Sequence, residues 1–233
     1  MIADPRAVAA RWPDPRLRAL AELACLVTEA PWALSREHHA RARAAGLSDD
    51  DVLHAIALAA FFGHLNRIAD AVDVPLDYRV RREPPRIERT VPPFLPAPAP
   101  VRGEPALSLA SREATTAALT RWQAYVARPS AALDARRRSM IAVRVAHLVG
   151  DPRAGADGPV AAAGAHASAD AGDRELLELA DRITLAPWTF DATSYAPLRG
   201  LGFDDRGIFD ACVAATTAGV ASRIHAALVA LGR

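Results

Sequence analysis

Apolar residues recur every three or four positions in several parts of this chain, which is the period of an amphipathic helix. This period is found in five stretches of the sequence, namely 16–28, 36–45, 49–72, 108–126 and 136–149. No stretch shows the strict alternation of apolar and polar residues that indicates a strand. The sequence therefore predicts an all-α fold.

Capping residues support the predicted boundaries of these helices. Pro31 interrupts the first helix because proline lacks the backbone N–H that a helix needs. Ser35 is a good N-cap for the next helix, and Gly46 is a typical residue after a helix end. Ser48 with Asp51 three residues later matches a capping box at the start of the long helix.

Two segments of the chain resemble each other without a gap. Residues 20–71 align with residues 176–227, and about one position in three is identical, including the run Ala-Pro-Trp that begins at Ala30 and at Ala186. In the second segment Asp191, Gly202 and Asp204 take the capping positions. We therefore expect a duplicated helical unit, with its two long helices packed together inside the chain.

This repeat suggests a division of the chain into a first unit over 1–82 and a second over 107–233. Residues 83–106 between them are rich in proline and predict an irregular linker. Within the second unit, 151–173 is composed largely of Ala, Gly and Asp, which predicts a flexible loop or a weakly formed helix.

Composition excludes several classes of function. The chain has 28 basic residues, all of them arginine, and 27 acidic ones, so no lysine is available for Schiff-base or Walker-A chemistry, and no excess of positive charge favours nucleic acid. The N-terminus lacks a secretory signal, and no uncharged stretch reaches the length of a bilayer span. Cys25 and Cys212 form no disulfide framework or metal motif. We expect a cytoplasmic protein without a metal, a cofactor or a membrane partner.

Polar residues gather in the last third of the long helix, on an otherwise apolar stretch. Asn66 and Asp70 are four residues apart and Arg67 and Asp70 three apart, so their side chains are able to touch. One interpretation is a structural cluster that ties the helix to its neighbours. The other is a pocket lined by His64, Asn66 and Arg67 that binds an anionic small molecule.

The run HARARAAGLSDDDVLHAIALAAFFGHLNRIADAV resembles the alkylhydroperoxidase D-like superfamily, which includes the carboxymuconolactone decarboxylases. The resemblance implies a repeated helical unit, a homo-oligomer and peroxidase-related or decarboxylase activity. The C-x-x-C-x-x-x-H motif of active members falls on Pro31, Leu34 and His38, so only the histidine matches. In the second unit it falls on Pro187, Phe190 and Ser194.

Two functional hypotheses follow from this resemblance. The first is an enzyme that uses His38 and His64 as acid–base groups, with Asn66, Arg67, Asp70 and Trp32 binding the substrate. The second is a non-catalytic helical scaffold that binds a small molecule or a protein partner. Because a thiol peroxidase needs an attacking and a resolving thiol close together, we expect the redox centre to be degenerate.

Overall fold

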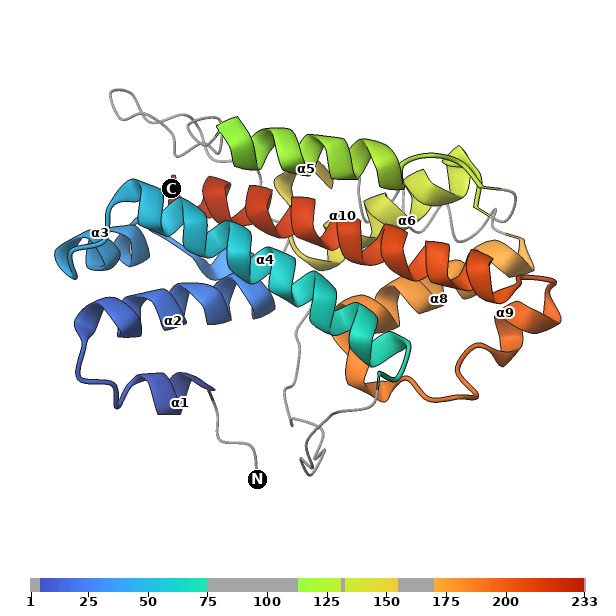
Figure 1. Cartoon of the computed structure of the whole chain (residues 1–233), viewed down its shortest axis with the longest axis horizontal. Helices are drawn as coiled ribbons and strands as arrows, with labels where there is room; N and C mark the ends of the chain where they lie inside the picture. The colour runs from blue at the N-terminus through green and yellow to red at the C-terminus, as the bar shows by residue number, and fades with distance from the viewer. Residues whose placement is uncertain (1–4, 75–112, 131–132, 155–169, 233) are drawn as a thin grey trace.

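The computed structural model describes residues 5–74, 113–130, 133–154 and 170–232. Within these ranges all regular secondary structure is helical, which confirms the predicted all-α class (Figure 1). The predicted linker at 83–106 lies outside the described residues. So does the start of the helix predicted at 108–126.

The first part of the chain forms a helical unit around the long helix α4. Its elements are α1 (Pro5–Ala9), α2 (Pro15–Glu29), the short 3-10 turn η1 (Pro31–Ala33), α3 (Arg36–Ala44) and α4 (Asp49–Ala71). The described part of the middle region contributes α5 (Glu113–Val126), α6 (Ala135–Leu148) and η3 (Pro152–Ala154). A second unit follows, with α8 (Ala171–Leu185), η4 (Pro187–Thr189), α9 (Ala196–Gly200) and α10 (Asp205–Leu231).

The helix starts are set by polar side chains that accept backbone hydrogen bonds. Asp14 caps α2 and Asp170 caps α8, while Ser48 and Asp51 form the expected capping box of α4. Most of the segment 151–173, predicted as a flexible loop or a weakly formed helix, lies outside the described residues at 155–169. At its two ends Pro152–Ala154 forms the 3-10 turn η3, and residues 171–173 belong to the regular helix α8. Asp170 explains the latter, since its carboxylate accepts from the backbone N–H of Asp173 and starts the helix there.

The helices of the two units correspond along the chain. Helix α8 begins and ends 156 residues after α2, and η4 begins and ends 156 residues after η1. Helix α10 likewise starts 156 residues after α4. The glycines between the last two helices of each unit also match, because Gly46 and Gly202 have φ of 87° and 89°. Residues with a Cβ rarely adopt this left-handed conformation, so glycine is required at both turns.

The short helix α9 is the main exception to this correspondence. It begins at residue 196, whereas a copy of α3 would begin at 192. A helix starting earlier would need an N–H from Pro197, which has none. Instead, the Asp191 carboxylate accepts from the backbone N–H of Thr193 and from the hydroxyl of Ser194, which fixes a turn.

The predicted contact between the long helices is confirmed, because α4 and α10 lie side by side at the centre of the fold (Figure 1). Helices α2 and α3 flank them on one side, and α6, α8 and α9 on the other. The buried apolar residues form two clusters, one around α2, α4 and the end of α10, and one around α6, α8 and the start of α10. By length and hydropathy alone α4 and α10 could cross a membrane, although α10 is mostly buried inside the protein.

Candidate functional site: a groove between helices α2 and α4

The two buried arginines of the long helices make reciprocal contacts between the units. Arg67 of α4 donates from Nε to the carbonyl of Thr184 in α8, at 3.4 Å. Arg223 of α10 donates from Nε to the carbonyl of Thr28 in α2, at 3.2 Å. Since Thr28 and Thr184 are also counterparts in the alignment, each unit holds the other by the same bond, as in an interface between two identical subunits.

Each arginine also folds back along its own helix, over a glycine four residues earlier. Arg67 Nη1 donates to the carbonyl of Gly63 at 2.9 Å, and Arg223 Nη1 donates to that of Gly219 at 3.3 Å. A Cβ on Gly63 would lie 2.9 Å from Arg67 Nη1, and one on Gly219 would lie 2.8 Å from Arg223 Nη1. These contacts favour the structural interpretation of the polar cluster, in which arginine and glycine work as a pair.

His64, also assigned to this cluster, does not converge with Arg67. His64 is buried on the face of α4 that meets α10 and α5, where its ring lies 4.7 Å from that of Trp122, edge to face. Burial lowers the pKa of His64, although a hydrogen bond with the backbone of Thr216 acts in the opposite direction. Its Nδ1 has no hydrogen-bond partner among the described residues. Asp70 is partly buried near the end of α4.

His38 lies in a second group of polar residues, between α2 and α3. Its Nδ1 is 2.8 Å from the hydroxyl of Ser35, and its Nε2 is 3.8 Å from a carboxylate oxygen of Glu22. Arg41 donates to the same carboxylate at 2.9 Å. Burial and the nearby Arg41 lower the pKa of His38, while Glu22 opposes the shift. Glu22 and Arg41 also line a cavity of about 610 Å³ beside α1.

Trp32 lies in η1, partly buried, and η1 packs against α10 rather than against the polar end of α4. The contacts of His38, His64 and Arg67 described above thus go to different helices. The structure places His38, His64 and Arg67 in separate environments, and it brings His38 within 3.8 Å of the carboxylate of Glu22.

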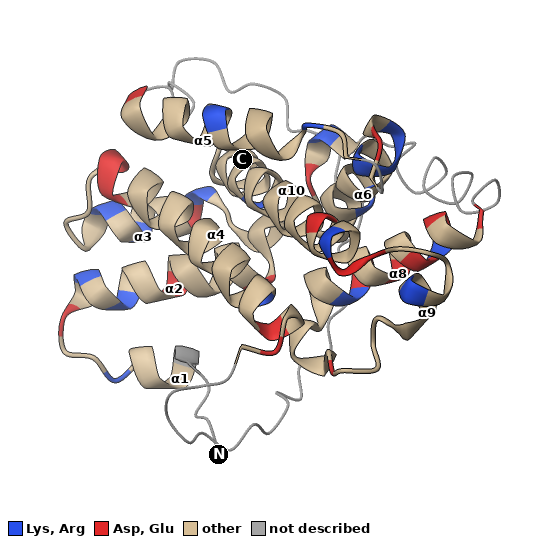
Figure 2. Cartoon of the chain, turned by 45° about the vertical axis from the view of Figure 1, so that its right-hand side comes forward, with Lys and Arg blue, Asp and Glu red and all other residues tan. Residues whose placement is uncertain are grey.

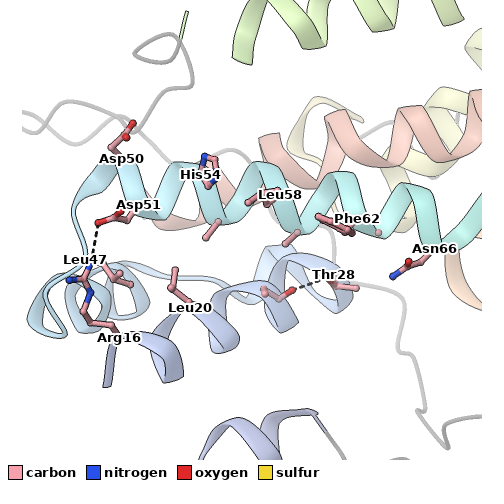
Figure 3. Close-up of a pocket in the computed structure, with 14 residues that line it drawn as sticks. Arg16, Leu20, Thr28, Leu47, Asp50, Asp51, His54, Leu58, Phe62 and Asn66 are labelled. Carbon is pink, nitrogen blue, oxygen red and sulfur yellow. Dashed lines mark hydrogen bonds and ion pairs between the residues drawn. The ribbon is translucent and has the colours of Figure 1, made fainter. Parts of the chain in front are cut away.

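A larger groove runs between α2 and α4, with a volume of about 770 Å³ (Figure 3). Its floor consists mainly of small residues, and Leu58 and Phe62 of α4 stand at its rim with 41% and 55% of their surface exposed. Fourteen residues line it: Arg16, Leu20, Ala24, Thr28, Leu47, Asp50, Asp51, His54, Ala55, Leu58, Ala59, Phe62, Gly63 and Asn66.

Charged groups occupy only one end of this groove. Arg16, Asp50 and Asp51 lie there, at the start of α4, and Asp51 is held by the Ser48 capping box with Arg16 at 3.9 Å. Asn66 lies at the opposite end (Figure 3). The acidic residues of α4 fall near its two ends, and the stretch 52–66 between them carries no aspartate, glutamate or arginine (Figure 2). The walls are therefore apolar and the entrance at one end is acidic.

Of the three residues that were expected to line a pocket, Asn66 lines this groove, whereas His64 and Arg67 do not. The other residues of the groove were not predicted from the sequence. Small residues such as Ala59 and Gly63 favour close approach by a neighbouring element, but α2 leaves this side of them open. Nothing in the sequence distinguishes an exposed Leu58 or Phe62 from a buried one. Their exposure depends on which helix covers α4.

The cysteines lie apart, on α2 and α10. Cys25 is partly buried and Cys212 is fully buried, and neither forms a disulfide. Burial raises the pKa of Cys212 to about 12, and the hydrogen bond with Tyr195 offsets only part of this shift. Among the residues that the structure describes, no group of three or more His, Cys, Asp or Glu side chains is arranged to hold a metal ion.

Comparison of the chain with protein-family models, with curated proteins and with solved structures finds no match. The groove between α2 and α4 and the polar groups around His38 are therefore the features that bear on function.

Proposed function

We propose that this protein is a helical scaffold of two like units that binds an apolar ligand in the groove between α2 and α4. The observation that carries this proposal is the exposure of Leu58 and Phe62 beside an open, mostly apolar groove. Large apolar side chains around a cavity are typical of binding sites, because covering them removes apolar surface from water. The buried arginines support the scaffold, since their hydrogen bonds join its helices.

We also propose that this protein is a duplicated member of the alkylhydroperoxidase D-like superfamily that has lost its redox centre. Pro31 and Leu34 stand at the cysteine positions of the motif. Cys212 is buried with a raised pKa, and thiol chemistry requires the thiolate. These observations support a protein without thiol peroxidase activity.

Peroxide consumption with dithiothreitol as the reductant tests this part of the proposal. We expect the protein to consume hydrogen peroxide and cumene hydroperoxide no faster than buffer with dithiothreitol alone. The matched control is the double variant Cys25→Ser, Cys212→Ser. Turnover by the natural protein that disappears in this variant would show a working thiol pair and contradict the proposal.

The groove itself is tested with Nile red, a neutral dye whose fluorescence rises in apolar sites. Leu58→Arg places a charge at the rim, so dye affinity should fall at least about tenfold, because covering a guanidinium without a partner is unfavourable. Leu65→Arg is the matched control, since Leu65 is similarly exposed on the same helix and does not line the groove. Equal affinities for both variants would show that the dye binds elsewhere.

A second candidate is an acid–base enzyme of the decarboxylase type, favoured by the group of Ser35, His38, Glu22 and Arg41 beside a cavity. Here His38 would transfer a proton and Arg41 would attract an anionic substrate. The test is decarboxylation of a carboxymuconolactone by the natural protein and by His38→Gln. Loss of activity in that variant alone, with His39→Gln as the control, would favour this enzyme over the scaffold.

A further inference from the structure

In the second unit, helix α6 lies in the groove between α8 and α10, which corresponds to the groove between α2 and α4. Ile141 and Val145 of α6 are fully buried in one cluster with Leu176 and Ala180 of α8 and with Ala211 of α10. Leu148, one turn further along α6, is buried as well. This helix therefore lies in the groove between α8 and α10, with aliphatic residues at i, i+4 and i+7 facing the floor.

The floor of this covered groove is the counterpart of the open groove in the first unit. Of the fourteen residues that line the open groove, six are identical to the residues numbered 156 higher, namely Leu20, Ala24, Thr28, Ala55, Ala59 and Gly63. Apart from Leu20, all six are small residues. A Cβ on Gly219, the counterpart of Gly63, would lie 3.7 Å from Val145 Cγ1, which is an ordinary contact distance, so α6 packs directly over this position.

The two grooves also have acidic groups at the same end, supplied by different residues. In the second unit, Asp173 accepts hydrogen bonds from Arg136 at 2.7 Å and Arg137 at 3.0 Å, and Asp210 lies 3.7 Å from Arg138. These arginines form the first turn of α6.

In the first unit the counterparts of Asp173 and Asp210 are Leu17 and His54. The negative charge at this end comes instead from Asp50 and Asp51, whose counterparts are Arg206 and Gly207, and Arg16 lies at the same end, 3.9 Å from Asp51. Both grooves thus combine a floor of small residues with an acidic entrance at the start of the long helix. This arrangement is complementary to a helix whose first turn is basic.

We propose that the groove between α2 and α4 is the binding site for an amphipathic helix of a partner protein, with a basic first turn followed by aliphatic residues at i, i+4 and i+7. This inference deepens the proposed function and rests on it. Recognition of a helix through such a spacing is a recurring mode of protein binding. The chain's own α6 is not available as the occupant, because Ile141 and Val145 are already buried in the second groove.

The probe is a fluorescein-labelled peptide with the sequence of residues 134–149, DARRRSMIAVRVAHLV, titrated with the full-length protein. We expect saturable binding by fluorescence anisotropy that weakens at least about tenfold in Leu58→Arg and stays within about twofold in Leu65→Arg. Because Leu58 lies on the first groove, its effect distinguishes that groove from exchange of the peptide with α6 in the second. A scrambled peptide of the same composition should not bind.

The acidic entrance is tested separately. A peptide with glutamine at positions 136, 137 and 138 should bind several-fold more weakly, and raising the salt concentration should weaken the natural peptide but not this one. Asp50→Asn should also reduce the affinity for the natural peptide about threefold. Asp49→Asn is the matched control, since Asp49 lies in the same helical turn and does not line the groove.

The outcomes separate this inference from the proposed function. If Nile red binding depends on Leu58 but no peptide binds, the groove takes another apolar ligand and the inference of a helix is wrong. If neither the dye nor the peptide responds to Leu58→Arg, both proposals fail. Two further results would overturn the inference, namely a dimer that Leu58→Arg converts to a monomer, or Leu58-dependent binding to phosphatidylcholine vesicles in place of the peptide.

Discussion

Apart from α9, the helices of the two units start at matching positions, yet their long helices are covered to different extents. In the second unit α6 covers the groove between α8 and α10, and α10 is buried along most of its length. In the first unit the groove between α2 and α4 is open, and apolar side chains of α4 reach solvent.

This difference shows that the same local pattern leads to a core in one unit and to a surface in the other. The inner groove residues are identical at six positions, so the floor does not decide the outcome. What differs is the presence of a covering helix and the residues at the rim, where Ala214 and Ala218 under α6 correspond to Leu58 and Phe62. Large side chains occupy the rim only where no described helix lies over it.

The strongest test of this difference removes apolar contacts from each groove. Ile141→Ala should reduce the free energy of unfolding by about 3 kcal/mol, because it leaves a cavity between α6 and the second groove. Leu58→Ala should cost under about 1 kcal/mol, since Leu58 is already exposed to water. Urea unfolding followed by circular dichroism measures both. Equal losses would show that the first groove is covered in solution.

The reciprocal arginines test whether the two units hold each other equally. Arg67→Met and Arg223→Met should each lower the free energy of unfolding by about 2 kcal/mol, because each leaves a buried carbonyl without its charged donor. The losses are measured by urea denaturation at pH 7. Values that differ by much more than about 1 kcal/mol would contradict the equivalence of the two contacts.

Asp151 anchors the end of α6 to α10 and has no counterpart in the first unit. Burial alone would raise the pKa of its carboxyl, but hydrogen bonds from His225 and Arg153 outweigh this and lower the pKa to about 2. The resulting stabilisation of about 2 kcal/mol is present above about pH 4, the unfolded pKa, and is lost as the pH falls toward 2.

Asp151→Asn should therefore be less stable than the natural protein at pH 7 by about that amount, and the difference should shrink between pH 4 and pH 2. Urea unfolding of both proteins at pH 7, 4 and 2.5 gives the comparison. Asp50→Asn is a suitable control, because it replaces an aspartate of the first unit. A difference that is constant with pH would exclude the ionised Asp151 as the anchor.

The smallest expected effect concerns the matching turns. Gly46→Ala and Gly202→Ala should each cost about 1 kcal/mol, because both glycines have a positive φ that alanine disfavours. The added Cβ would meet no closer atom than Arg16 Cδ at 4.0 Å from Gly46, so the cost is one of backbone strain in both turns. Thermal unfolding of the two variants should show equal shifts, and a loss at only one position would show that the turns are not equivalent.

Much of the helical framework could be predicted because its signals are local. The long helix predicted at 49–72 is observed as Asp49–Ala71, and its capping box forms as expected. Pro31 and Gly46 mark helix ends because their backbone properties act within one or two residues. The alignment of 20–71 with 176–227 likewise pointed to the residues that later proved to be counterparts in the contacts of Arg67 and Arg223.

The candidate site was predicted less well, because it depends on contacts between distant residues. His64 was expected to line a pocket, and it lies under Trp122 of α5, 58 positions away in the sequence. His38 and Glu22 lie on different helices, and only the packing of α3 on α2 brings them within 3.8 Å. No local pattern indicates such proximity.

The sequence by itself determined that this chain is all-α and where most of its helices begin and end. Those properties depend on backbone hydrogen bonding, proline and glycine geometry and the period of apolar residues, all of which act over a few positions. Only the tertiary structure decided that Arg67 and Arg223 join the halves, and that one groove is covered by α6 while the other is open. The physical reason is that burial depends on what packs against a surface, and identical surfaces become core or binding site according to the neighbour they receive.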